Sequence, residues 1–220
     1  MRPSLRLALL LPLLLLASCH ADPPRIDTQA RSFDGLYPVR NTGAVRAWAR
    51  ADLDLSGYRA LLHESGGVRY APVEHGPAAR DRFPISPEAR SRLASLMERS
   101  FRESVARVPG YAVAKAPGPE VLLVRTMLLD VASRIPPAGS GPDVVFLEEL
   151  GAATLLVELV DSESGAVLVR ALETRRVRDP SGLRRSVPAR DRATVERAVQ
   201  LWGEDLAAAL ERIHARFTIE

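Results

Sequence analysis

The sequence contains a single cysteine, Cys19, in 220 residues. One thiol cannot form a disulfide within the chain, even in an oxidising compartment, and it excludes every Cys-x-x-C motif. Packing of side chains alone must therefore hold the fold together.

Common enzyme motifs are also missing. There is no His-Glu-x-x-His, Gly-x-Ser-x-Gly, phosphate-binding loop or Gly-x-Gly-x-x-Gly. The carboxylate pair Glu148-Glu149 need not share a site, because adjacent side chains diverge on strands and helices. We predict no enzymatic activity and no catalytic, metal or cofactor site. The four histidines lack metal-ligand spacing, although one alternative stays open, a metal site or proton relay that pairs His63-Glu64 with Glu74-His75; the other two are His20 and His214.

Lysine is nearly absent, because only Lys115 among the 30 basic residues is a lysine and the other 29 are arginines. This bias is typical of a G+C-rich genome. Without Arg2 and Arg6 of the N-terminal segment, 28 basic residues face 27 acidic ones, a net charge of +1. Nucleic-acid binding requires a clustered positive excess, so we expect no nucleic-acid partner.

The N-terminus has the layout of an export signal. Two arginines precede the apolar run Leu7–Leu16, and two small residues follow it. The run is shorter than the ~20 apolar residues that span a bilayer as a helix, and Pro12 interrupts it. We therefore expect residues 1–18 to be a signal peptide and not a permanent membrane span.

Leu16-Ala17-Ser18-Cys19 resembles the bacterial lipobox, at which the cysteine is acylated, with palmitate among the acyl chains, and the signal is cut just before it. Several acyl chains hold a protein essentially permanently, whereas one holds it marginally. The next residue is His20 and not the aspartate of inner-membrane retention, which implies an outer-membrane anchor facing the periplasm. We expect a lipidated Cys19 with a flexible tether over residues 19–50, and a periplasmic domain over residues 51–220.

Two segments predict long helices. Residues 87–108 begin with the N-cap candidate Ser86 and with Pro87, and carry apolar residues at three-to-four spacing. Residues 190–216 have the more regular apolar stripe, which could line a core or a partner helix. Packing on the chain's own sheet is the expectation, with Trp202 as a core residue.

The longest apolar run after the signal, Glu120–Ala132, is apolar on both alternating faces and predicts a central strand. Its charges Arg125 and Asp130 are expected to be paired. Thr154–Asp161 and Ala166–Arg175 predict an antiparallel hairpin. With shorter strand candidates at Tyr58–His63, Val68–Val73 and Tyr111–Ala114, we predict a single α/β (α+β) domain, in which two long helices pack on a mixed, mostly antiparallel sheet of about five strands.

The arginine-rich segment 176–192 allows two interpretations. It could contact anionic lipid headgroups, or it could be an exposed loop partly compensated by Asp179 and Asp191. The second interpretation is the favoured one.

Several segments together resemble a family of bacterial lipoproteins, domain of unknown function 3313. They are Asp54–Tyr58 (DLSGY), the helix start ISPEARSRL at 85–93, the turn at 116–119 that leads into EVLLVRTMLLDV, the hairpin arm 151–165 and Trp202. The resemblance covers residues 35–215. It implies two helices on a mixed sheet, similar to domains of envelope assembly proteins, and no catalytic residues.

We therefore expect a lipid-anchored envelope lipoprotein with a non-enzymatic binding or scaffold domain, whose partner is an envelope protein or glycan. Two alternatives remain open. The protein could be an oligomeric subunit of an envelope assembly or secretion complex, or a periplasmic hydrolase or metal-binding enzyme that uses His63 and His75.

Overall fold

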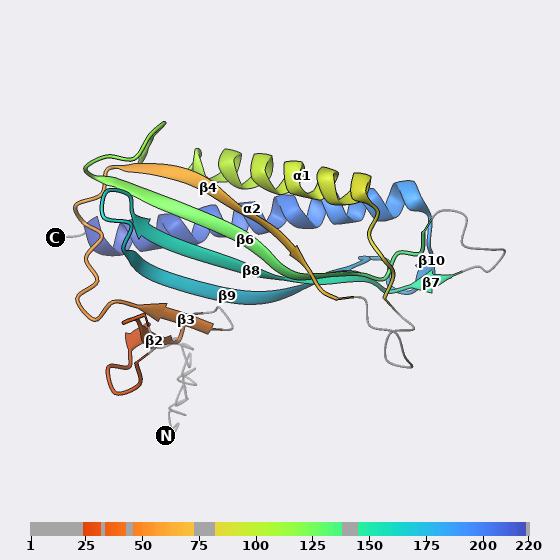
Figure 1. The fold of residues 1–220 in the computed structure, drawn as a ribbon, viewed down its shortest axis with the longest axis horizontal. Coiled ribbons are helices and arrows are strands. Elements are labelled where there is room, and N and C mark those ends of the chain that lie inside the picture. The colour runs from red at the N-terminus through yellow and green to blue at the C-terminus, as the bar shows by residue number, and fades with distance from the viewer. Residues whose placement is uncertain (1–23, 32–33, 43–45, 73–81, 138–144, 219–220) are drawn as a thin grey trace, which may run out of the picture.

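The computed structural model describes residues 24–31, 34–42, 46–72, 82–137 and 145–218. Two helices, α1 (Pro87–Val105) and α2 (Pro188–Thr218), lie side by side along one face of an eight-stranded sheet. In Figure 1 the strands lie in front of α2, so the viewer faces the side of the sheet without helices.

The strand order in this sheet is β1-β2-β3-β9-β8-β6-β4-β5. β4 pairs in parallel with β6 and β5, and every other neighbouring pair is antiparallel. β7 and β10 form a second, two-stranded antiparallel sheet. The strands are β1 (Arg25–Ile26), β2 (Tyr37–Arg40), β3 (Arg46–Ala49), β4 (Ala60–Tyr70), β5 (Ala112–Val113), β6 (Val121–Ser133), β7 (Phe146–Leu147), β8 (Glu149–Asp161), β9 (Val167–Arg178) and β10 (Arg184–Arg185).

The central strand is confirmed as β6, which lies between β8 and β4. Leu122, Val124 and Leu128 face the helices and are at most 1% exposed. Asp130 is an exposed residue with a φ of 53°, between Leu129 and Ala132 where the pairing with β8 shifts register. The bulge therefore carries this charge out of the sheet.

Both helices are confirmed, and local chemistry fixes the start of α1. The Ser86 side chain accepts a hydrogen bond from the Ala89 N–H, and Pro87 occupies the first turn, where its missing N–H costs nothing. Phe101 and Met97 of α1 are fully buried against the sheet and α2. Gly203 of α2 lies against α1, because a Cβ there would come within 2.6 Å of Ser104 Oγ.

The prediction of about five strands is wrong. β1, β2 and β3 lie within residues 19–50, where a tether was expected, and they extend the sheet beyond β9. These strands are two to four residues long, too short for an alternating pattern to stand out. The separate strand candidates Tyr58–His63 and Val68–Val73 lie largely in one strand, since β4 runs through Gly66-Gly67 and only its pairing is irregular there.

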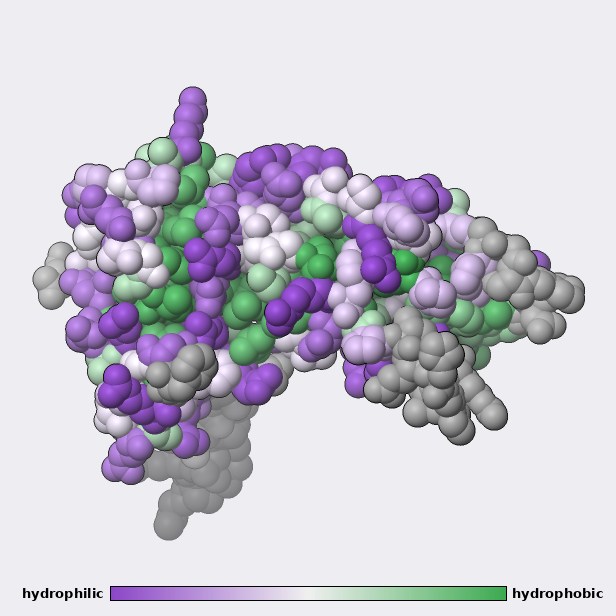
Figure 2. Space-filling model, in the orientation of Figure 1, coloured by the Kyte–Doolittle hydropathy of each residue, from purple (hydrophilic) through white to green (hydrophobic). Residues whose placement is uncertain are grey.

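A row of alternating charges crosses the face of the sheet without helices. Glu64, Arg125, Glu158 and Arg170 lie opposite one another on β4, β6, β8 and β9. Arg125 pairs with both carboxylates, at 2.6 Å from Glu64 and 3.3 Å from Glu158, and Arg170 joins Glu158 to Asp34. The expected pairing of Arg125 is thus confirmed. Figure 2 shows hydrophobic patches between hydrophilic residues on this face.

Candidate functional site

Those candidate residues that the structure describes do not form a common polar site. Cys19, His20 and His75 lie outside the described residues. His63 lies opposite Val124 on the helix-covered face, where its Nε2 is 2.9 Å from Thr126 Oγ1. Burial, and secondarily Arg102, lowers the pKa of His63 to about 4, against the opposing effect of two glutamates. The adjacent Glu64 lies on the other face, so the two side chains share no site.

Two further candidates from the sequence, His214 and Glu149, make contacts that stabilise the fold. The ring of His214 packs against the ring of Tyr111 at a tilt of 56°, with centroids 4.4 Å apart. Glu149 pairs with Arg134 and Arg176, both at 3.3 Å. Among the described ranges, no three His, Cys, Asp or Glu side chains come close enough to hold a metal ion.

The arginine-rich segment 176–192 contains a buried ion cluster. Arg184 pairs with Asp179 at 2.5 Å and with Asp191 at 2.8 Å, and both carboxylates are at most 1% exposed. Ser186 also donates a hydrogen bond to Asp191. Asp191 belongs to the first turn of α2, so the cluster fixes the start of this helix to β10. These two buried ion pairs fix the position of the Arg184 side chain within the domain.

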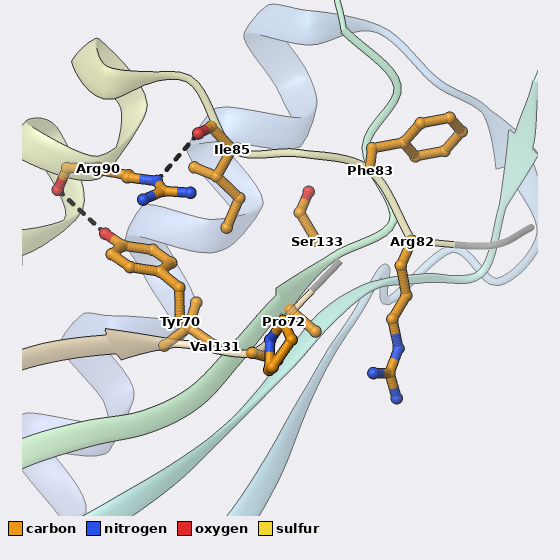
Figure 3. A pocket seen from close by; sticks show the side chains of 10 residues that line it. Tyr70, Pro72, Arg82, Phe83, Ile85, Arg90, Val131 and Ser133 are labelled. Carbon is orange, nitrogen blue, oxygen red and sulfur yellow. Dashed lines mark hydrogen bonds between the residues drawn. The ribbon is translucent and has the colours of Figure 1, made fainter. Parts of the chain in front are cut away.

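A small cavity lies between the end of β4 and the start of α1 (Figure 3). The Arg90 guanidinium lies 4.5 Å from the ring centroid of Tyr70, whose hydroxyl donates to the Arg90 carbonyl at 3.3 Å. Arg90 Nε in turn donates to the Ile85 carbonyl at 3.0 Å. The free volume is about 10 Å³, about the space that one water needs. This cavity is too small for an organic ligand.

A larger groove lies between α2 and the hairpin of β8 and β9, and it holds about 140 Å³ of free space. We call it the α2 groove. Its apolar lining consists of Leu155, Val157 and Leu159 from β8, Val169 and Ala171 from β9, and Trp202, Leu206, Ala209, Leu210 and Ile213 from α2. Val169 and Ala171 pair with β3, which therefore borders the groove.

The α2 groove has a polar end formed by Glu173, Arg175 and Asp205. Arg175 contacts Asp205 at 2.5 Å and Glu173 at 2.7 Å. Burial disfavours the charge of Arg175, but the two carboxylates outweigh burial and raise the pKa of the guanidinium above its ordinary value. Arg175 Nε is buried and has no hydrogen-bond partner among the described residues.

The lining of the α2 groove suits the binding of a ligand better than the making or breaking of a covalent bond. Most small-molecule sites are concave and mainly apolar with a few polar groups, and the α2 groove has this character. The sequence indicated the apolar stripe of α2 but not the groove, because Ala209 and Ala171 stand where larger side chains would close the space. Small residues at helical spacing in an otherwise large apolar stripe were the available signal.

No described helix is long and apolar enough to cross a membrane.

The chain belongs to the family described as "Protein of unknown function (DUF3313)", whose model matches residues 27–206. This match confirms the resemblance noted in the sequence. A comparison with curated proteins finds no match.

Several solved structures align with most of the chain at low similarity. A PelC dodecamer from Paraburkholderia phytofirmans is 15% identical, covers 76% of this chain and 95% of its own, and gives a TM-score of 0.34. A Xanthomonas campestris protein of the family model DUF330 is 15% identical, with coverages of 77% and 94% and a TM-score of 0.42. A Caulobacter crescentus protein provisionally named a lipoprotein is 14% identical, with coverages of 76% and 96% and a TM-score of 0.38. At these TM-scores the likenesses carry no function to this chain.

Proposed function

We propose that the protein is an outer-membrane lipoprotein, anchored by acylated Cys19, whose periplasmic domain binds another envelope component without catalysing a reaction. The export signal and the lipobox-like Leu16-Ala17-Ser18-Cys19 support the anchor, and His20 supports the outer membrane.

The observation that carries the binding function is the α2 groove. It is concave and apolar, and its three charged residues are engaged with one another in ion pairs. Catalysis by general acids and bases instead requires titratable groups within hydrogen-bond reach of the reacting atoms, with pKa values near the working pH. The one described histidine with a strongly shifted pKa, His63, is committed to Thr126 on the covered face of β4.

Site-specific cross-linking in intact cells tests this function. A photo-reactive amino acid replaces Ala209, which lines the groove, or the neighbouring Ala208, which does not. We expect position 209 to capture one defined envelope component, identified by mass spectrometry, and position 208 to capture none. Capture at neither position, or equal capture at both, would contradict a binding function for the groove.

A further inference from the structure

The chain between Cys19 and the domain is short. Arg25, the first residue of β1, is six residues after Cys19. Because an extended chain spans at most about 3.6 Å per residue, an anchor on Cys19 holds β1 within about 20 Å of the lipid surface. β2 and β3 lie between β1 and β9, and neighbouring strands are about 4.8 Å apart, so the β9 wall of the α2 groove lies about 15 Å beyond β1.

The free space of the α2 groove restricts its occupant. At about 140 Å³ it is close to the ~150 Å³ of an apolar cavity that admits benzene. An α-helix, about 10–12 Å across with its side chains, is too wide. The space fits a slim hydrocarbon, such as part of one acyl chain, and its ten apolar lining residues match that chemistry.

The polar end of the groove indicates which end group such a chain carries. Glu173, Arg175 and Asp205 sum to a charge of −1, which disfavours an anionic carboxylate. Within the described part of the chain, the buried Arg175 Nε–H has no acceptor, and a buried donor gains from an acceptor supplied by a ligand. A neutral ester carbonyl satisfies both conditions.

We propose that the α2 groove binds one ester-linked acyl chain of a membrane amphiphile, with the chain along the apolar lining and the ester at Arg175. This inference rests on the proposed function, since the Cys19 anchor holds the groove within about 35 Å of the lipid surface. It adds the chemical class of the ligand.

Fluorescence of Trp202 provides the test, because Trp202 lines the groove and the only other tryptophan is Trp48 on β3. The full chain with Trp48→Phe is titrated with a lysophosphatidylcholine that carries a dibrominated stearoyl chain, below its micelle concentration. Bromine quenches tryptophan only at close range. We expect saturable quenching in this protein and none in the Trp202→Phe protein, which retains Trp48.

Two neighbouring substitutions in the Trp48→Phe chain are the matched controls. Ala209→Phe fills part of the groove and should displace about two methylenes of the bound acyl chain. At about 0.8 kcal/mol for each methylene, this loss weakens binding about tenfold. Ala208→Phe adds the same side chain outside the groove lining and should leave affinity within about twofold, a change of less than 0.5 kcal/mol. Thermal unfolding of both variants shows whether each remains folded.

The absence of saturable quenching, or equal weakening by both substitutions in folded proteins, would overturn the proposal. Tighter binding of the free dibromostearic acid than of its lysolipid ester would overturn the assignment of Arg175 to an ester. A protein or glycan captured from position 209 supports a binding function while it refutes the acyl ligand. Unmodified Cys19 would refute the anchor whatever the quenching result.

Discussion

The hydroxyl of Tyr58 donates a hydrogen bond of 2.8 Å to Oδ2 of Asp161. This bond joins the residues before β4 to the last residue of β8, next to the turn into β9, across 103 positions in sequence. Asp161 also accepts hydrogen bonds from Ser164 within that turn. Tyr58 ends the segment Asp54–Tyr58, and Leu55 of this segment is 2% exposed. The segment thus serves the fold.

Tyr58→Phe should lower the free energy of unfolding by about 1 kcal/mol, because it removes one partly exposed hydrogen bond to a carboxylate and little else. Urea denaturation measures the change. Burial, and then the hydrogen bond to Asp161, raises the pKa of Tyr58 to about 12. Ultraviolet titration should therefore show one tyrosine fewer ionising well above pH 10 in the variant than in the wild type. Unchanged stability together with an unchanged titration would contradict this role.

Gly203→Ala tests the close approach of the two helices. In an exposed helix, replacing glycine with alanine stabilises the helix by up to about 1 kcal/mol. At Gly203 the added methyl would lie 2.6 Å from Ser104 Oγ and 3.2 Å from the Ser100 carbonyl, so we expect a net loss of about 1–3 kcal/mol. Adding Ser104→Ala removes the nearest atom and should restore about half of the loss. A single variant more stable than the wild type would show that the helices are not in tight contact.

Glu158→Gln tests the row of charges on the face without helices. The Glu158 side chain is 10% exposed and pairs with both Arg125 and Arg170. Loss of the negative charge leaves two partly buried arginines with one carboxylate fewer. We expect the free energy of unfolding to fall by about 1–3 kcal/mol. The matched control is Glu98→Gln, which breaks the exposed pair with Arg102 and should cost less than about 0.5 kcal/mol. Equal effects in chemical denaturation would contradict the account.

His63 makes stability depend on pH. Its pKa in the folded protein is about 4, below the ~6.5 of an unfolded chain, so the unfolded state binds the proton more readily between these values. The contribution of neutral His63 is complete above pH 6.5 and is lost as the pH falls toward 4. With solvent screening it amounts to about 1–2 kcal/mol.

Urea unfolding at pH 7 and at pH 5 measures this dependence, with His63→Gln as the reference that lacks it. The wild type should lose more stability than the variant on acidification. If NMR shows His63 titrating near its ordinary pKa in the folded protein, the proposed burial effect is absent.

Long patterned segments could be predicted from the sequence, whereas pairings between distant segments could not. Ser86 and Pro87 marked the start of α1, and the two-sided apolar pattern placed β6 inside the sheet. β1, β2 and β3 were missed because they are only two to four residues long and depend on a chain of pairings, β1 with β2, β2 with β3 and β3 with the distant β9. Propensity in such short segments yields to tertiary contacts.

The candidate site was predictable only in part. The stripe of α2 that contains Trp202 was correctly expected to pack on the sheet. The small side chain of Ala209 is visible in the sequence, but the free space beside it also depends on how far α2 lies from β9, which no local pattern encodes. The buried pairing of Arg184 with Asp191 likewise depends on a loop conformation, although partial compensation by this aspartate was expected.

Membrane fractionation with intact-mass analysis, comparing the wild type with Cys19→Ala, tests the central claim most directly. The account predicts that the wild type floats with the outer membrane and has an N-terminal Cys19 that carries three acyl chains, while the variant is unprocessed or released from the membrane. A wild-type protein that remains in the soluble fraction and is cut at another residue would contradict the lipid anchor.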